Sequence, residues 1–267
     1  MTFFKRKLLA SLSAVLLFGH TTMAQDVDVN ALIKQAEKIA YYAGDDGRAD
    51  ARMLIVDAQG RKQMRQFTIL RKDVEDNGDQ KMMVFFSRPT DVKDTVFRVE
   101  KHAANDVDDD RWLYLPALDL VKRISAGDKR TSFVGSHFFY EDVSGRAVAQ
   151  DNFTLQDETN DVYVLKATPK QPDSVEFAHY IVHIDKTTSL PVLIDFFKED
   201  GTHYRRVETV TVEEVQGFPT VLRSKVSDLA SGGYTLMEFR NTQYNIDLPD
   251  DVFSERSLRT PPLKWIQ

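Results

Sequence analysis

The chain has 267 residues, of which 42% are hydrophobic and 28% are charged, and its formal net charge is −6 at pH 7. This composition is typical of a globular protein and excludes a disordered chain or a collagen-like fibre. The negative charge disfavours nucleic acid as a partner, because binding a polyanion normally needs a basic surface.

The first 24 residues have the pattern of a secretory signal peptide. Three basic residues at 5–7 precede an apolar run over 8–18, and a small residue, Ala24, ends the segment. We expect export to the periplasm and cleavage after Ala24, because an uncleaved anchor would need about 20 apolar residues to span a membrane. Removal of this segment leaves 32 basic against 41 acidic side chains, a net charge of −9. The chain has no cysteine, which excludes disulfides, thiolate metal sites and a lipid-bearing N-terminal cysteine.

The first element expected in the mature chain is an amphipathic helix. It should begin at Asn30, a good N-cap residue, and end at Gly44, a good stop. Apolar side chains recur between them at helical spacing, at Leu32, Ile33, Ala36, Ile39, Ala40 and Ala43.

Most of the remaining chain alternates with period two, as in residues 49–55 and 178–184, which predicts strands. Turn residues separate these runs at 57–60, 77–78, 160–161, 185–188, 200–201, 216–217 and 232–233. The last four turns have centres 14, 16 and 15 residues apart, which indicates long consecutive hairpins. A long twisted antiparallel sheet must curl, so the pattern favours a barrel or half-barrel.

Two stretches depart from the alternation. Residues 82–86 are apolar on both strand faces, which predicts that both sides of the sheet are covered there, whether by a helix, a lid or an ordinary second layer. Residues 116–145 lose the period, and four aromatic residues lie within 133–140. This segment suits a loop with a short helix, which could form either a mobile lid or a static plug over an apolar surface.

Candidate functional residues follow from these two stretches. The hypothesis for the apolar interior or its cover includes Met83, Phe85, Phe97, Trp112, Tyr114, Phe133, Phe138 and Phe139. The candidates for holding the lid or contacting a partner are Arg123, Arg130, Tyr140, Glu141 and Asp142. The two adjacent acids, Glu141 and Asp142, could serve as a general acid and base, but capping a helix or pairing with Arg123, Lys129 or Arg130 is the simpler interpretation.

No motif of enzyme chemistry is recognisable. The chain lacks a nucleophile elbow, a glycine-rich phosphate loop and a zinc-binding helix motif. His179 and His183 would lie about 13 Å apart on a strand and cannot share one ion. The acidic run at 106–110 lacks the glycine and glutamate of an EF-hand loop. We therefore expect no catalytic residue, no cofactor and no metal.

Several ordered motifs resemble the outer-membrane lipoprotein-sorting proteins of the LolA-like superfamily. They are Ser87-Arg88-Pro89 with Asp94-Thr95-Val96-Phe97, the stretches 110–118 and 123–125, the aromatic run 132–143 and the closing stretch 247–254. Two positions depart from that pattern, since His137 stands where an acidic residue is common and Val134 where methionine is common.

The resemblance covers essentially all of the mature chain and implies one domain over residues 25–267. Its fold would be mainly β (α+β), a strongly curved antiparallel sheet forming a half-open barrel, with an N-terminal helix and a central helical or loop lid on the concave side. Such proteins shield acyl chains in an apolar cavity, and this branch is associated with RND-type exporters. The resemblance therefore implies a periplasmic carrier or chaperone for a lipid or lipoprotein, with transient membrane contact. A non-lipid-binding adaptor that docks onto an exporter through its acidic exterior is the alternative, and a hydrolase using Glu141, Asp142 and a histidine is the third.

Overall fold

The computed structural model describes residues 27–75, 78–104 and 107–267. The expected signal peptide, its cleavage site and parts of the 77–78 turn and the 106–110 acidic run lie outside these residues. No helix within the described residues is long and apolar enough to span a membrane.

Strands make up most of the described chain. The strands are β1 (Asp46–Val56), β2 (Lys62–Asp73), β3 (Gln80–Arg88), β4 (Val96–Lys101), β5 (Asp110–Leu115), β6 (Leu120–Ile124), β7 (Asp151–Glu158), β8 (Val162–Pro169), β9 (His179–Asp185), β10 (Pro191–Phe197), β11 (His203–Val215), β12 (Phe218–Asp228) and β13 (Tyr234–Tyr244). The α-helices are α1 (Val29–Tyr41), α2 (Tyr140–Ser144), α3 (Arg256–Arg259) and α4 (Leu263–Ile266). Short 3-10 turns are η1 (Pro116–Leu118), η2 (Ala126–Asp128), η3 (Val148–Gln150), η4 (Pro172–Ser174) and η5 (Asp250–Phe253).

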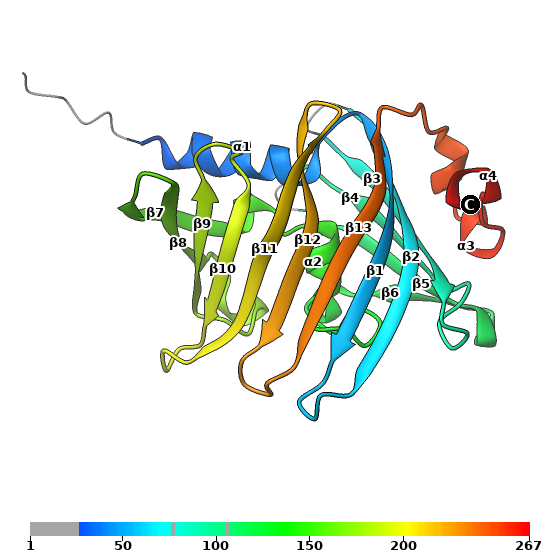
Figure 1. The fold of residues 1–267 in the computed structure, drawn as a ribbon, viewed down its shortest axis with the longest axis horizontal. Coiled ribbons are helices and arrows are strands. Elements are labelled where there is room, and N and C mark those ends of the chain that lie inside the picture. The colour runs from blue at the N-terminus through cyan, green and yellow to red at the C-terminus, as the bar shows by residue number, and fades with distance from the viewer. Residues whose placement is uncertain (1–26, 76–77, 105–106) are drawn as a thin grey trace, which may run out of the picture.

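The strands form one curled antiparallel sheet. Its order is β6-β5-β4-β3-β2-β1-β13-β12-β11-β10-β9-β8-β7, so chain neighbours pair everywhere except where β1 meets β13. Among the described residues β6 and β7 are the two edges, and the sheet does not close (Figure 1). This confirms the half-open barrel expected from the turn spacing and from the resemblance.

The opening helix is confirmed, but the predicted positions of its two ends were wrong by a few residues. The side chain of Asp28, not that of Asn30, caps the helix by accepting the backbone N–H groups of Asn30 and Ala31 at 3.0 Å. The helix ends at Tyr41, three residues before Gly44. It lies across the upper ends of the strands in Figure 1 and contacts β7 and β12.

Three apolar clusters fill the space around the sheet. The plug cluster lies on the concave face and consists of Ala51, Met53, Phe67, Met82, Val84, Phe86, Phe97, Val99, Leu113, Ile124, Phe133, Phe138, Tyr140, Val226 and Met237. The helix cluster lies under α1 and consists of Ile33, Ala36, Leu165, Ala167, Phe177, Tyr180, Val182, Ile184, Phe196 and Tyr204. The outer cluster lies under the C-terminal residues and consists of Leu70, Met83, Phe85, Val96, Leu248, Val252, Phe253 and Leu258.

The two-sided cover expected over residues 82–86 is confirmed. Met82, Val84 and Phe86 belong to the plug cluster, whereas Met83 and Phe85 belong to the outer cluster. The C-terminal residues therefore form a second layer on the convex side, next to β3 and β4 (Figure 1).

Candidate binding cavity

The central segment, residues 125–150, joins one edge of the sheet to the other. It leaves β6, contains η2, α2 and η3, and enters β7. In Figure 1, α2 lies behind the front strands, on the concave side of the sheet. The chain must cross one side of the sheet here, because β6 and β7 are its opposite edges, and Phe133, Phe138 and Tyr140 in the plug cluster place the crossing on the concave side.

Aromatic side chains of the central segment pack tightly against the sheet. The Phe133 ring has no exposed surface, and its centroid lies 5.4 Å from that of Phe97, 5.7 Å from that of Phe86 and 5.5 Å from that of Tyr140. Separations of 4.5–7 Å are those of favourable aromatic pairs. This part of the concave side is therefore filled with side chains, as in the static-plug interpretation.

A buried carboxylate anchors the central segment. Glu141 is only 2% exposed and lies 2.7 Å from Arg130, 3.2 Å from Arg146 and 3.5 Å from Lys129. Burial alone would raise the pKa of Glu141. The charges of Arg130 and Arg146 lower it by more, so the pKa of Glu141 lies below its usual value. An ionised Glu141 thus holds three cations from its own segment together.

Two further ion pairs connect the central segment to the rest of the protein, one to the loop before β9 and one to β11. Arg130 also binds Glu176 at 2.6 Å, and Asp142 pairs with Arg205 of β11. Asp142 in addition accepts the backbone N–H of Phe139 at 2.6 Å. The Arg205 guanidinium lies over the Phe139 ring, 4.3 Å from its centroid. Arg205 therefore fixes both the start of α2 and the ring that precedes it.

The other two candidates for holding the central segment or contacting a partner, Tyr140 and Arg123, lie elsewhere. Tyr140 is buried in the plug cluster. Arg123 pairs with Asp110 on the outer side of β6, and its side chain is 69% exposed. Arg123 is therefore not a partner of Glu141 or Asp142, and the candidates that the structure brings together are Arg130, Glu141 and Asp142.

A cavity of about 350 Å³ lies between the plug cluster and the helix cluster. Its walls come from the end of α1, from β1 and β2, from β10–β13 and from the central segment through Phe138, Asp142 and Val143. Pockets for small ligands usually have about 300–1,000 Å³. The volume is therefore suited to a ligand such as an acyl chain.

The cavity wall is mainly apolar, and its charged groups have partners. Ile194, Val207, Met237 and Phe239 contribute much of the wall. The guanidinium of Arg71 donates to the backbone carbonyls of Tyr41 and Ala43. Three larger hollows, about 670 Å³ beside Arg88, about 370 Å³ beside Arg240 and about 780 Å³ beside α1, have walls about as polar as they are apolar and suit an acyl chain less well.

Three of the eight predicted interior residues belong to the plug cluster. They are Phe97, Phe133 and Phe138, and of these Phe138 also lines the cavity. Phe139 lies beside them, between the guanidinium groups of Arg130 and Arg205.

The placement of the other four predicted residues is corrected by the strand register. Cross-strand pairing places these four residues on one face of β3–β5. One row across the strands is Met83, Arg98 and Trp112, and the other is Phe85, Val96 and Tyr114. This face packs beneath the C-terminal residues in the outer cluster. Met83, Phe85, Trp112 and Tyr114 therefore point away from the cavity, to the convex side of the sheet.

Sequence reasoning missed the strands that form most of the cavity wall. Val207, Met237 and Phe239 lie on β11 and β13, far in sequence from the aromatic residues of 133–140 on which the prediction was based. The only signal for them was the alternation of apolar residues along these strands, which does not reveal which side is concave.

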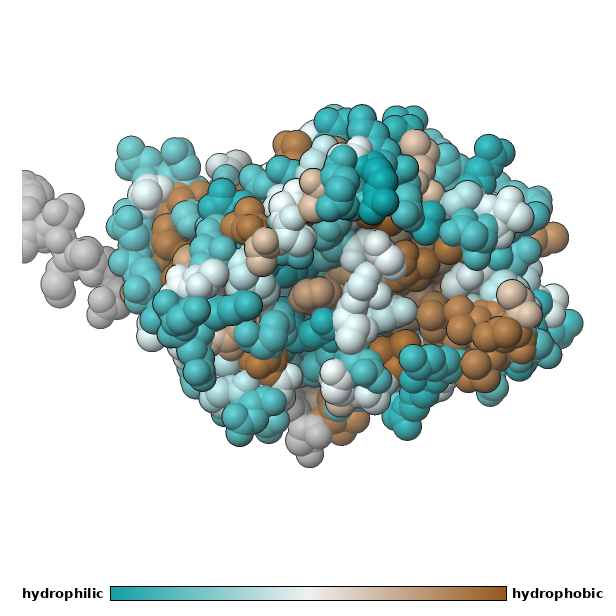
Figure 2. All heavy atoms as spheres, turned by 90° about the horizontal axis from the view of Figure 1, so that it is seen from below, coloured by the Kyte–Doolittle hydropathy of each residue, from teal (hydrophilic) through white to brown (hydrophobic). Residues whose placement is uncertain are grey.

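Apolar side chains also reach the surface at one end of the molecule. In the view from below they gather on the half that contains β3–β6 (Figure 2). Leu118, at the tip of the β5–β6 hairpin, is 70% exposed, and Leu120 is 46% exposed. These residues lie at the opposite end of the sheet from the α1 end that borders the cavity.

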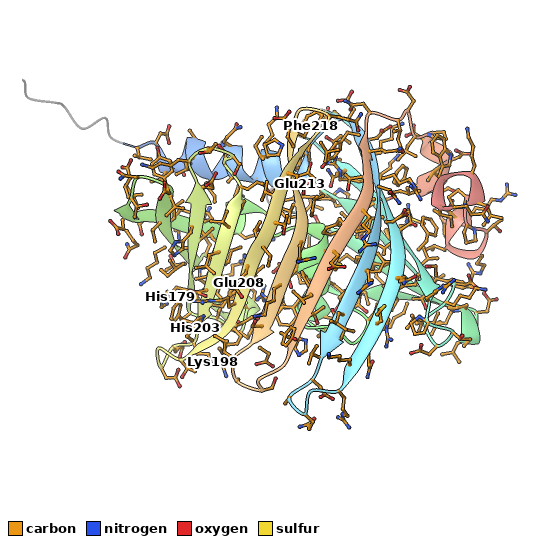
Figure 3. The ribbon with its side chains drawn as sticks, in the orientation of Figure 1. His179, Lys198, His203, Glu208, Glu213 and Phe218 are labelled. Carbon is orange, nitrogen blue, oxygen red and sulfur yellow. The ribbon has the colours of Figure 1, made fainter. Side chains whose placement is uncertain are left out.

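Histidines on the convex face stack against an aromatic ring. His179 and His203, labelled in Figure 3, flank Phe197 with centroid distances of 5.0 Å and 4.9 Å. His203 also lies 2.9 Å from Asp195. Within residues 27–75, 78–104 and 107–267, no group of three histidine or acidic side chains is placed to hold a metal ion.

Gly145, which follows α2, has a backbone that disfavours any side chain. Its φ is +84°, and a Cβ atom there would lie 3.0 Å from the Tyr41 ring. We expect Gly145→Ala to lower the free energy of unfolding by about 2–4 kcal/mol. The φ of +84° with a ψ of +134° is a combination that residues with a side chain rarely adopt, at a cost of about 1–3 kcal/mol, and crowding of Tyr41 adds to this cost. Gly201→Ala is the control, since its φ is +82° with nothing within 4 Å of the added atom. Equal losses in urea unfolding of the two variants would show that the Tyr41 contact contributes nothing.

The chain is similar to several solved structures. A DUF1329 family protein from Desulfovibrio piger shares 27% identity and a TM-score of 0.79, over 85% of this chain and 96% of that one. An outer-membrane lipoprotein-sorting protein domain from Vibrio parahaemolyticus shares 24% identity and a TM-score of 0.76, over 86% and 97% of the two chains. A LolA superfamily protein from Nitrosomonas europaea shares 17% identity and a TM-score of 0.66, over 86% and 99%.

Comparisons of the sequence were made with curated proteins and with family models. None of the curated proteins matches this sequence. A model for the family described as "-like: Uncharacterized protein" matches residues 78–260, more than half of the chain. The chain therefore belongs to the family that this model describes, and it has the fold of the LolA-like superfamily of outer-membrane lipoprotein-sorting proteins.

Proposed function

We propose that the protein is a periplasmic carrier that holds an acyl chain of a lipid or lipoprotein in the cavity between the plug cluster and the helix cluster. The observation that supports this most is the mainly apolar wall of the cavity of about 350 Å³. Its charged groups, Arg48, Arg71 and Asp142, are already paired with protein groups. Such a wall suits a long apolar group and offers little to a charged substrate.

The free energy of hydration explains why such a carrier needs a cavity. Exposing an acyl chain to water costs about 0.8 kcal/mol for each methylene, or roughly 12 kcal/mol for a palmitoyl chain. A soluble shuttle must offset most of this cost by burying the chain. The cavity on β10–β13 provides that burial without covalent chemistry.

Release of the chain is proposed to involve the central segment. Phe138, Asp142 and Val143 line the cavity, and the Asp142–Arg205 pair fixes this segment to β11. A bound chain would press against these side chains, so a partner that opens the Asp142–Arg205 pair would favour release. The resemblance suggests an RND-type exporter as that partner.

Mass spectrometry of gently purified protein tests the proposal. Protein from the native host should carry an acyl species at near-stoichiometric level. Val207→Trp, which fills the cavity, should lose the species, whereas Glu208→Trp, on the opposite face of the same strand, should keep it. Absence of acyl species from the wild-type protein, or equal loading of the two variants, would contradict carriage.

An adaptor without lipid is the second candidate, and one surface favours it. The acidic exterior expected of an adaptor is interrupted on the convex face of β12, β13 and β1 by a group of arginines. Arg52, Arg223 and Arg240 share Glu238 there, and the side chain of Arg240 is 71% exposed. An adaptor would dock an acidic partner through this face. A tight exporter complex containing no acyl species would favour that function.

A further inference from the structure

A β-bulge at the α1 end of the cavity reverses which side chains of β13 face inward. The register between β1 and β13 shifts from Asp50↔Arg240 to Arg48↔Gln243, so β13 accommodates one extra residue there. Asn241 adopts a φ of +50°, and its side chain donates to Asp50 at 2.9 Å. Bulges of this kind re-aim the side chains that follow them.

The cavity wall shows the effect of this reversal. Met237 and Phe239 line the cavity before the bulge, whereas Thr242 and Tyr244 line it afterwards. Odd-numbered positions thus give way to even-numbered ones, and the wall changes from apolar side chains to hydroxyl groups. This polar end lies beside Ala43 and Gly47, next to the end of α1.

Three hydroxyls of the wall, those of Thr209, Thr220 and Tyr244, are already bonded within the protein. Thr209 donates to the carbonyl of Pro191 at 2.9 Å. Thr220 lies 2.9 Å from both the carbonyl of Phe218 and the hydroxyl of Tyr244. These groups need no ligand.

Thr242 differs from these residues. Its Oγ1 is buried and has no hydrogen-bond partner within the described part of the chain. Leaving a buried hydroxyl unpaired costs about 1–3 kcal/mol. Rotation about the Cα–Cβ bond, between staggered rotamers, would present this hydroxyl to the cavity that the residue lines. Ser224, which also lines the cavity, lies further along the wall, where it pairs in register with Thr209 and Met237.

We propose that Thr242 donates a hydrogen bond to the carbonyl of an esterified or amidated acyl chain, and that the cavity therefore selects acyl esters and amides over alkyl ethers and free fatty acids. This inference rests on the proposed function. The carbonyl marks the polar head end of an acyl chain, and the polar end of the wall at Thr242 would hold that end. An ionised carboxylate is disfavoured because the two cations beside the cavity are already paired with acids, Arg71 with Asp73 and Arg48 with Asp50.

Two lipids that differ only at the carbonyl provide the test. The fluorescent probe 1-N-phenylnaphthylamine is bound to the mature protein and displaced by 1-monolauroylglycerol, by 1-O-dodecylglycerol or by laurate at pH 8. We expect the ester to bind about threefold to tenfold more tightly than the ether, as one neutral hydrogen bond predicts, and laurate to bind less tightly than the ester.

Matched variants assign the effect to one hydroxyl. Thr242→Val keeps the shape of the side chain and should remove the preference for the ester, and Thr242→Ser should keep it. Thr209→Val and Ser224→Ala should also keep it, because their hydroxyls are bonded within the protein or lie away from the bulge. Far-ultraviolet circular dichroism checks that each variant is folded.

The possible failures are distinguishable. Failure of the probe and of all three lipids to bind would overturn the proposed function and this inference with it. Binding of ester and ether with equal affinity, or an unchanged preference in Thr242→Val, would overturn this inference alone and leave acyl carriage standing.

Discussion

Replacing Glu141 with glutamine is expected to lower the free energy of unfolding by about 3–5 kcal/mol. Removal of one charge from a buried ion pair leaves its partners uncompensated, and such losses are typically of that size. Here three cations surround a carboxylate that is 2% exposed. Glutamine has nearly the same shape, so the loss would report charge rather than packing. Urea unfolding of the two proteins at pH 7 measures it.

The pH dependence gives the same substitution a second readout. Because the pKa of Glu141 is lowered in the folded protein, its contribution is fully present above its unfolded pKa, about 4.5, and is lost as the pH falls through the folded value. The difference between wild type and Glu141→Gln should therefore shrink below pH 4.5. Arg123→Ala is the control, since its exposed pair with Asp110 should contribute at most about 1 kcal/mol. A loss below 1 kcal/mol for Glu141→Gln would contradict the anchoring role.

Replacing Phe133 with alanine is expected to lower the free energy of unfolding by about 3–5 kcal/mol. The ring has no exposed surface and packs against Phe67, Phe86, Phe97 and Tyr140. Its removal would leave a cavity in the plug cluster, and the cost of such cavities adds to the lost transfer free energy.

An exposed apolar residue supplies the comparison for Phe133. Leu118→Ala should change the free energy of unfolding by no more than about 0.5 kcal/mol, because Leu118 is 70% exposed. Similar small losses for both variants would show that the central segment does not pack as a plug in solution. A large loss for Phe133→Ala alone supports the plug.

Local chemistry explains why the overall fold was predictable. Turn residues at 57–60, 200–201, 216–217 and 232–233 all lie between consecutive strands, since their backbone preferences act over a few residues. Helix α1 was found from its spacing, but two polar residues near its start compete as caps, and Asp28 accepts both N–H groups.

Long-range register explains what could not be predicted. The apolar run 82–86 indicated two covered faces, but period two alone does not show which face is concave. The odd-numbered residues Met83 and Phe85 were predicted to face the cavity, but the even-numbered residues of 82–86 face the concave interior. The bulge at Asn241 is equally hidden, because it depends on pairing with β1, about 190 residues earlier in the chain.

The ion pairs that hold the central segment were predictable only in part, for a similar reason. Arg130 lies close to Glu141 in sequence, and pairing between them was foreseen. Arg205 lies 63 residues from Asp142, and only the folded sheet brings the two together. Sequence spacing carries no information about such a pair.

Photocrosslinking inside the cavity tests the central claim most directly. A palmitoyl lipid with a diazirine at the middle of its chain is loaded onto the mature protein, irradiated and mapped by peptide mass spectrometry. The account predicts labelling of wall residues such as Val207, Met237 and Phe239, and loss of that labelling in Val207→Trp. Labelling confined to the outer cluster, around Met83 and Phe253, would contradict it.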